Sequence, residues 1–371
     1  MQILKEKIKQ KAKTLGFDVV GFTKPHVDED TKKKFKEFLE NNCHGEMKWL
    51  EKHFEKKIDP KIIWDEVQTV MVLGLNYGPK ANPLLKNNFK EIANTSVYAN
   101  NKDYHHVILK KLNLMQKWLI NELKIKSKLF VDTSPVLEKY FAKKADIGWQ
   151  GKHTNLVSKE FGSWLFLAEI FLPIKLNLNN NSIDNCGNCR KCLDICPTGA
   201  LIDEYKIDAR KCISYLTIEY KGPFPQRIRK KIGNKIYGCD DCLSVCPWNK
   251  FSTPTNNKDF LSSKNEKELS FFLGFSEKKF KIFFKNSPIK RIGWVSFMRN
   301  IIIASGNSEE KSLIKYLKKL SKNDNPIIRG SCIWSLNQLM EEKEKKIFEY
   351  MKRKEKNKYV LYELDMTDKF F

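Results

Sequence analysis

Apolar residues follow two different patterns along the chain. In the first 175 residues, segments with the three- to four-residue spacing of amphipathic helices alternate with short, continuously apolar segments typical of buried strands. Helices and strands mixed in this order predict an α+β domain over residues 1–175. The pattern predicts helices at 4–15, 105–124 and 136–145, strands at 18–22, 68–77, 128–131 and 163–172, and an irregular loop at 80–104.

Only helical spacing remains after residue 256. Two fragments, 294–306 and 330–339, resemble each other at an offset of roughly thirty residues, which favours a short HEAT-like helical repeat over 256–371. An ordinary helical bundle is the alternative. The predicted helices are 271–284, 291–304, 309–320, 326–340 and 342–350.

Eight of the ten cysteines lie between these regions, in a segment that we predict to be a ferredoxin-like domain over 176–255. A C-x2-C-x2-C spacing lets three thiolates bind one 4Fe-4S cluster, while the next spacer and its proline direct the fourth thiolate to a second cluster. The spacing therefore predicts two clusters with crossed ligands. The first set is Cys186, Cys189, Cys192 and Cys246, and the second is Cys196, Cys212, Cys239 and Cys242.

Zinc binding and disulfide formation fit the cysteine pattern less well. Structural zinc uses four ligands in two pairs, whereas each of these runs ends in Cys-Pro after a longer series. A disulfide framework suits small secreted domains, and a chain of 371 residues with 41% hydrophobic residues can build its own cores. The N-terminal residues show no apolar signal region, so we expect a cytoplasmic protein without membrane spans.

The formal net charge of +24 indicates a polyanionic partner such as nucleic acid. A Lys- and Asn-rich composition also arises from genome base bias, so charge alone leaves both origins open. The basic run 227–231 has the same ambiguity, because most charge runs are simply solvated faces.

A candidate acid stands at the end of a predicted strand. The segment Asp132-Thr-Ser-Pro135 follows strand 128–131 and precedes a helix. Asp132 could cap that helix, which is a common role for Asp before a helix that starts at proline. It could also serve as a general acid, provided that burial raises its pKa. Tyr104, His105 and His153 are weaker candidates, because a lone histidine is more often structural.

Five segments together resemble epoxyqueuosine reductase, over nearly the whole chain. The segments around Asp132 and Gly148 and the Cys-Pro-Trp-Asn ending make the resemblance specific, because cysteine runs alone would indicate only a two-cluster ferredoxin. The segments are Val131-Asp-Thr-Ser-Pro-Val-Leu-Glu, Gly148-Trp-Gln-Gly-Lys-His-Thr, the cysteine run ending in Cys-Pro-Thr-Gly-Ala-Leu201, Tyr215-Leu-Thr-Ile-Glu-Tyr-Lys-Gly222 and Gly238-Cys-Asp-Asp-Cys-Leu-Ser-Val-Cys-Pro-Trp-Asn249.

The resemblance implies an oxidoreductase that removes the epoxide oxygen of epoxyqueuosine in tRNA, using cobalamin and two 4Fe-4S clusters. It implies an N-terminal α/β cobalamin-binding domain, Asp132 as general acid, an external electron donor and a monomer. The implied cobalamin contacts are Lys57, Ser96, Asp132, Trp149, Lys152, His153, Leu156, Leu167 and Ser214, and the implied tRNA contacts are Lys221, Arg227 and Arg229.

Two departures from the family pattern concern these contacts. Lys57 replaces a usual arginine, and His153 follows Lys152 where the family commonly has asparagine. The chain also lacks an Asp-x-His-x-x-Gly run, which implies a cobalamin without a protein histidine on its lower face. The rival functions are a corrinoid reductive dehalogenase, which normally carries an export signal, and a non-catalytic two-cluster electron carrier, which would leave Asp132 and Trp149 without a role.

Overall fold

The structure is a computed structural model, and it describes residues 2–132, 134–178, 182–261 and 266–367. The chain divides into two compact units, each built from three separate segments. Unit 1 comprises residues 1–82, 102–210 and 241–261, and unit 2 comprises 83–101, 211–240 and 262–371. This division differs from the three sequential domains of the sequence analysis, because the cysteine-rich segment contributes to both units.

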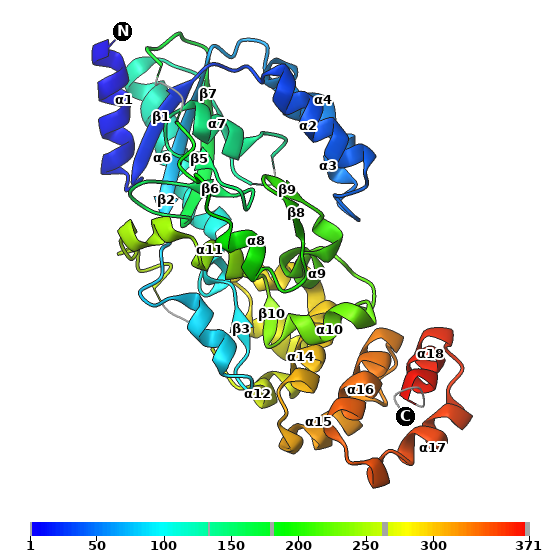
Figure 1. The fold of residues 1–371 in the computed structure, drawn as a ribbon. Coiled ribbons are helices and arrows are strands. Elements are labelled where there is room, and N and C mark those ends of the chain that lie inside the picture. Colours follow the sequence, from blue (N-terminus) through cyan, green and yellow to red (C-terminus); the bar gives the residue numbers. More distant parts are fainter. Residues whose placement is uncertain (1, 133, 179–181, 262–265, 368–371) are drawn as a thin grey trace. The chain divides into compact units, whose positions relative to one another are not determined.

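A four-stranded antiparallel sheet lies at the centre of unit 1 (Figure 1). The strands form where apolar residues are continuous, and β2 is buried at every position. Antiparallel pairing agrees with an α+β fold and corrects the expectation of an α/β domain, whose sheet would be parallel. In sheet order the strands are β1 (Val19–Thr23), β2 (Thr69–Asn76), β7 (Leu165–Leu172) and β4 (Lys128–Phe130).

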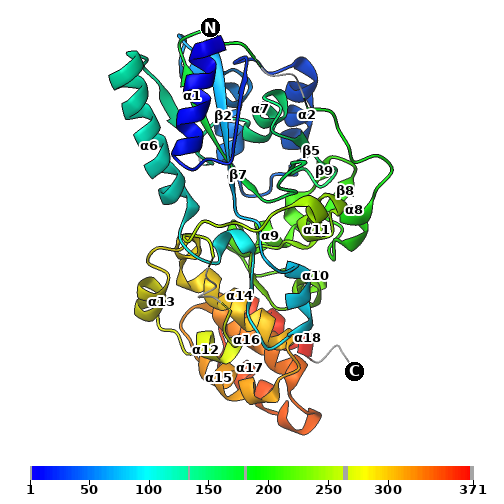
Figure 2. The same ribbon diagram turned by 90° about the vertical axis from the view of Figure 1, so that its left-hand side faces the viewer.

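Helices cover both faces of this sheet. Figure 2 shows α1 (Gln2–Thr14) and α6 (Tyr104–Leu123) on one side and α7 (Glu138–Lys144) on the other. The three predicted helices are therefore confirmed. Asp103 begins α6, because its carboxylate accepts the backbone N–H of His105.

Four helices between β1 and β2 escaped the sequence analysis. The first of them, α2, has no buried residue, and eight of its twelve residues are charged. Asp28 caps α2 by accepting the backbone N–H of Thr31. The four are α2 (Glu29–Glu40), α3 (Trp49–Lys52), α4 (Phe54–Ile58) and α5 (Pro60–Ile63).

Two short helices carry Cys192 and Cys242, and most of the other cysteines of unit 1 lie in the loops beside them. Helix α8 (Lys191–Ile195) packs against α11 (Asp241–Ser244), which brings the two cysteine runs together. No disulfide links cysteines of the described chain. The other short elements are β5 (Trp149–Gln150), β6 (Leu156–Val157), β8 (Leu201–Asp203), β9 (Lys206–Ile207) and the 3-10 turns η3 (Ala209–Lys211) and η4 (Pro247–Phe251).

The described residues of unit 2 are mainly helical, with one parallel strand pair, β3 (Asn94–Thr95) with β10 (Lys235–Tyr237). The predicted loop 80–104 thus contains a strand and two 3-10 turns. The predicted helix 271–284 is two helices, since Ser276 caps the second. The helical elements are η1 (Pro83–Asn88), η2 (Val97–Ala99), α9 (Ile213–Ile218), α10 (Gln226–Ile232), α12 (Leu269–Leu273), α13 (Glu277–Phe283), η5 (Pro288–Ile292), α14 (Gly293–Asn307), η6 (Lys311–Leu313), α15 (Ile314–Leu320), α16 (Pro326–Leu339), η7 (Glu342–Glu344), α17 (Ile347–Lys354) and α18 (Lys358–Thr367).

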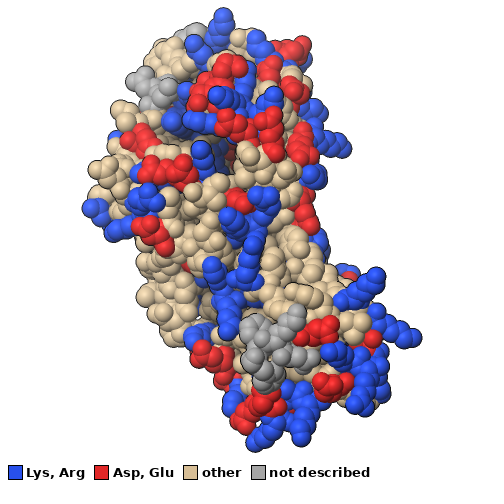
Figure 3. All heavy atoms as spheres, turned by 45° about the vertical axis from the view of Figure 1, so that its right-hand side comes forward, with Lys and Arg blue, Asp and Glu red and all other residues tan. Residues whose placement is uncertain are grey.

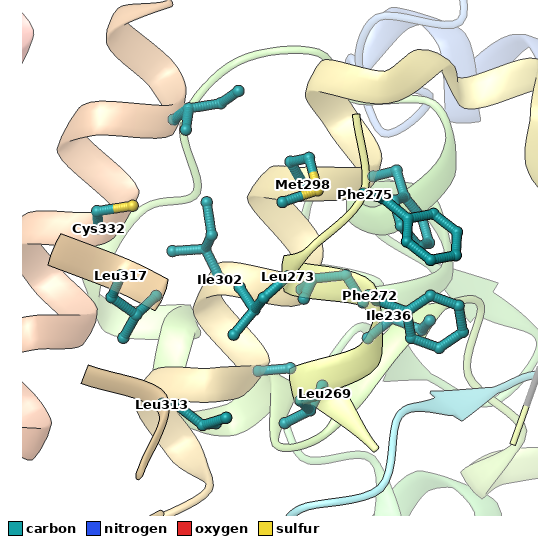
Figure 4. Packing of buried hydrophobic residues seen from close by; sticks show 14 of the residues in the cluster. Ile236, Leu269, Phe272, Leu273, Phe275, Met298, Ile302, Leu313, Leu317 and Cys332 are labelled. Atoms are coloured by element: carbon teal, nitrogen blue, oxygen red, sulfur yellow. The ribbon is translucent and has the colours of Figure 1, made fainter. Parts of the chain in front are cut away.

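The core of unit 2 forms around α14, which is buried along most of its length. Figure 4 shows side chains of α12, α14, α15 and α16 converging there, with Ile236 of β10 beside them. Each such side chain contributes about 1.5–3 kcal/mol by leaving water. Within the described residues, no helix is both long and apolar enough to cross a bilayer.

Two buried arginines connect separate segments inside unit 2. The Arg299 guanidinium donates to the backbone oxygens of Leu216, Tyr220 and Gly222. Arg229 donates to both carboxylate oxygens of Glu363 at 2.7 and 2.6 Å. The prediction that Arg229 contacts tRNA is wrong, because its side chain is 2% exposed and its nitrogens already donate to Glu363 and to the Phe224 oxygen.

Candidate functional site

Four cysteines of unit 1 line one cavity of about 200 Å³. They are Cys186, Cys189, Cys192 and Cys246, the set predicted for the first cluster. The first three come from the loop before α8 and from α8 itself, and Cys246 follows α11. The structure thus brings together the fourth cysteine of one run and the first three of the other, as crossed ligation requires.

The chemistry of this cavity suits iron. Burial raises the pKa of Cys186 and Cys246, and it raises that of Cys192 to about 11. The charges of Cys186 and Cys246 raise the pKa of Cys192 further. Ionising these thiols therefore needs cationic partners, and the irons of a 4Fe-4S cluster would supply them.

Two tryptophans border the cysteine loop, and each donates its indole N–H to a different kind of acceptor. Trp149 Nε1 donates to Cys186 Sγ at 3.4 Å, whereas Trp248 Nε1 donates to the backbone oxygen of Asn185 at 3.2 Å. Their rings meet edge to face, with centroids 5.0 Å apart. Trp149 thus acts directly on a predicted cluster ligand.

Lys152 and His153 also line the cysteine cavity, and both are buried. Lys152 Nζ donates to the Gly187 oxygen and to Glu204, both at 2.7 Å, which fixes the cysteine loop. His153 Nδ1 accepts the backbone N–H of Asn155, and burial lowers the pKa of His153 to about 4. His153 is therefore neutral at pH 7, and its contact with cobalamin stays a prediction.

The second predicted cysteine set is divided between the units. Cys196 and Cys242 belong to unit 1, and Cys212 and Cys239 belong to unit 2. Cys196 Sγ accepts the backbone N–H of Ala200 at 3.3 Å. Binding of a second cluster by these four cysteines stays a prediction.

Asp132 lies two residues beyond the end of β4, with its side chain 51% exposed. Its φ of +44° is in the left-handed region, which Asp tolerates better than most residues. Asp132 does not cap α7, because that helix begins after Leu137 without a side-chain cap. The capping hypothesis is therefore wrong. Thr133 of the same motif lies outside the described residues.

The Asp132 carboxylate ends a chain of hydrogen bonds from the start of α6. Its Oδ2 accepts from the Tyr104 hydroxyl at 2.6 Å and lies 2.9 Å from His105 Nε2. His105 Nδ1 lies 2.8 Å from Oδ1 of the buried Asp103. A neutral imidazole can donate to only one of two carboxylates, so a second proton belongs on His105 Nε2 or Asp132 Oδ2. Tyr104 and His105, weak candidates by sequence, are thus part of the site.

Stacked aromatic rings adjoin this carboxylate. Phe166 stacks on Tyr104 with ring centroids 4.3 Å apart and on Tyr77 with centroids 4.2 Å apart. These rings come from β7, from α6 and from the residue after β2. They give the exposed acid an apolar flank.

Two glutamates near Asp132 were missed by the sequence analysis, which named the neighbouring Lys57 only as an implied cobalamin contact. Glu138 Oε1 accepts the backbone N–H of Asp132 at 2.5 Å, and Glu169 is fully buried in β7. Burial, with the nearby charge of Asp132, raises the pKa of Glu138 to about 7, and burial raises that of Glu169 well above its usual value. Burial lowers the pKa of Lys57, whereas the nearby charges of Glu138, Asp132 and Glu169 raise it. An acid inside an apolar strand was the signal that could have identified Glu169.

The remaining predicted contacts are placed as follows. The side chains of Leu156 and Leu167 pack in the core of unit 1, so their contact with cobalamin stays a prediction that rests on backbone atoms. Ser96, in unit 2, donates to Asp240. Ser214 is half-buried on α9.

Basic residues are spread widely over the surface. Figure 3 shows Lys and Arg at many places on the surface, with Asp and Glu among them and uncharged areas between. Lys221 and Arg227 are exposed, and Lys221 Nζ donates to the Ile218 oxygen, so their contacts with tRNA stay a prediction. The net charge of +24 is thus distributed and does not form one patch on this face.

Comparisons with known proteins support both parts of the site. Residues 185–249, which contain all eight cysteines, match a family described as a 4Fe-4S double cluster binding domain. Residues 57–133 match the family described as epoxyqueuosine reductase QueG, DUF1730. The epoxyqueuosine reductase of Escherichia coli K12 is 36% identical, over 92% of this chain and 90% of its own length. The chain belongs to the epoxyqueuosine reductase family.

Solved structures of epoxyqueuosine reductases have the same fold. One of them is in complex with a tRNA-Tyr stem loop modified with epoxyqueuosine. It is 28% identical to this chain with a TM-score of 0.89, and the match covers 98% of this chain and 97% of that protein. Another, from Bacillus subtilis, is 28% identical with a TM-score of 0.88, and its catalytic aspartate loop is swung out of the active site. This match covers 99% of this chain and 99% of the Bacillus subtilis protein. The family is thus that of an oxidoreductase.

Proposed function

We propose that this protein reduces epoxyqueuosine to queuosine in tRNA. The observation that carries the proposal is the exposed Asp132 carboxylate, which Tyr104 and His105 hold in place within a chain that also has a double-cluster domain. Removal of an epoxide oxygen as water consumes two electrons and two protons. Side chains do not supply electrons at low potential, so bound cofactors are needed.

The residues around Asp132 supply a proton. We assign Asp132 as the general acid that protonates the oxygen of the opened epoxide. The proton shared between His105 Nε2 and Asp132 Oδ2 makes His105 the group that restores the acid after transfer. Asp103 orients the ring by accepting from Nδ1, and the Tyr104 hydroxyl fixes the carboxylate.

The cofactors of the proposal are two 4Fe-4S clusters and cobalamin. When bound, they supply the two electrons of the reduction. Cys186, Cys189, Cys192 and Cys246 would hold one cluster, and the other four cysteines the second. For cobalamin, the stacked rings of Tyr77, Phe166 and Tyr104 offer an apolar wall beside Asp132, which suits a large, flat macrocycle.

The partners follow from the same assignment. We propose a tRNA bearing epoxyqueuosine as substrate, with exposed Lys221 and Arg227 as phosphate contacts and the helices of unit 2, in a HEAT-like arrangement, as part of the tRNA surface. The loop carrying Asp132 would be the movable aspartate loop of this chain, by similarity to the Bacillus subtilis structure. An external electron donor, a monomeric state and a cytoplasmic location complete the proposal.

A single-turnover assay tests this function. Anaerobically purified protein, loaded with cobalamin and reduced chemically, is mixed with epoxyqueuosine tRNA, and queuosine is measured by mass spectrometry of the nucleosides. Conversion that requires both the clusters and cobalamin supports the proposal. A protein that takes up clusters but neither binds cobalamin nor converts the tRNA would instead be an electron carrier.

A further inference from the structure

Glu169 has an unusual position for an acid. It lies in the interior of β7, where its neighbours are Val72 of β2 and Phe130 of β4, and its exposure is 0%. Among the described residues, no N–H or O–H group donates to either of its carboxylate oxygens. An ionised carboxylate without donors is strongly unfavourable in such a place, so Glu169 must hold a proton or share one.

Glu138 is the group with which Glu169 can share a proton. Helix α7, which carries Glu138, packs against β7, and the Glu138 carboxyl is among the groups that raise the pKa of Glu169. Since both carboxyls are acceptors when ionised, a bond between them requires one proton. Glu138 Oε1 also accepts the Asp132 backbone N–H. The shared proton therefore leaves Glu138 with the negative charge that strengthens its bond to the Asp132 amide.

The surrounding charges favour one proton on this pair. The groups that act on it are Lys57, Lys139 and Asp132, contributed by the helices and loops packed around β7. Lys57 is 6% exposed and partly offsets one negative charge. If both glutamates were ionised, the second negative charge would repel the first and also the charge of Asp132. The raised pKa values of both glutamates agree with a single shared proton at neutral pH.

We propose that Glu138 and Glu169 share one proton and together act as positioning residues, holding the Asp132 backbone in its left-handed conformation. Asp132 is then fixed from two sides. Glu138 holds its amide, and Tyr104 and His105 hold its carboxylate. The expected effect on turnover rests on the proposed function of Asp132 as general acid. The expected effect on the backbone conformation at Asp132 does not.

The pair makes the site sensitive to alkaline pH. Loss of the shared proton places two carboxylates beside Asp132, so the Glu138–Glu169 bond is lost and the amide anchor weakens. Stability contributed by the shared proton is present at lower pH and is lost as the pH rises through the raised pKa of the pair. The single-turnover rate should therefore fall on the alkaline side, through loosening of the Asp132 loop.

The test compares two replacements of Glu169 that differ in donor capacity. Glu169→Gln keeps the shape and a permanent N–H donor toward Glu138, whereas Glu169→Met keeps the volume and removes the donor. Two readouts are measured from pH 6 to 9: hydrogen exchange of the segment around Asp132, and the single-turnover rate. Glu160→Gln, on an exposed side chain, is the matched control.

We expect Glu169→Met to increase exchange around Asp132 and to slow turnover about tenfold, with cluster content unchanged. Glu169→Gln should restore protection and remove the alkaline fall, because it has no proton to lose. Normal exchange and rate in Glu169→Met, or an unchanged alkaline fall in Glu169→Gln, would overturn the proposal. If Glu169→Met does not fold, Glu138→Leu tests the same anchor. If the unmodified protein does not convert tRNA, the exchange data still decide the inference.

Discussion

Replacing Trp149 by phenylalanine should lower the reduction potential of the cluster held by Cys186. The indole N–H donates to Cys186 Sγ at 3.4 Å, and reduction adds negative charge to the sulfurs. The hydrogen bond therefore stabilises the reduced cluster more than the oxidised one. Phenylalanine keeps an aromatic ring in this buried site and removes only the donor.

The size of the shift follows from the bond. Hydrogen bonds to charged groups contribute about 1.5–3 kcal/mol, and only the part that changes on reduction counts, which we take as about 0.5–1 kcal/mol at this long N–S distance. For a one-electron couple this corresponds to a decrease of about 20–40 mV.

The assay is an EPR-monitored redox titration of the anaerobic protein. Trp248→Phe is the matched control, because its indole donates to the Asn185 oxygen and not to a sulfur. Its shift should be clearly smaller, and the second cluster should keep its potential in both variants. An equal or higher potential in Trp149→Phe, with intact cluster content, would refute the role of this hydrogen bond.

Three further predictions concern other parts of the molecule. Asp132→Asn should fold and bind cobalamin but slow single turnover about a hundredfold, as expected for loss of a proton donor, and a near-normal rate would assign the proton to another group. Cys246→Ala should damage the same cluster as Cys189→Ala, as judged by iron content and EPR; damage to the other cluster would exclude crossed ligation. Glu363→Gln should destabilise unit 2 by about 3 kcal/mol in chemical unfolding, since it leaves the buried Arg229 without its carboxylate; a loss below about 1 kcal/mol would contradict this.

Local pattern was enough for much of the fold. The two long strands of the central sheet, β2 and β7, are almost entirely apolar, and α6 has apolar residues at helical spacing, so these elements were predictable within a few residues. The helix α2 was not predicted, because eight of its twelve residues are charged and only three are apolar. The same argument explains the split of 271–284, where a capping serine interrupts one apolar pattern.

The candidate site was predictable in its residues but not in its contacts. The cysteine spacing indicated one four-cysteine set that the structure brings together, and Asp132 was identified from its position after a strand. The bond from Asp132 to His105 spans 27 residues, and that from Arg229 to Glu363 spans 134. Such pairings arise only when distant elements pack, so a basic run such as 227–231 does not reveal that one of its members is buried.

The interleaved segments of the two units affect how the chain is made on the ribosome. The core of unit 2 combines Ala93, Ile236 and Leu364, so its last contributor leaves the ribosome long after its first. Residues 83–101 and 211–240 must wait for the C-terminal helices before their apolar faces are covered. A shortened chain ending near residue 255 would leave the same faces in water. Substitutions at exposed residues such as Lys221 and Arg227 therefore probe tRNA binding more cleanly than any truncation.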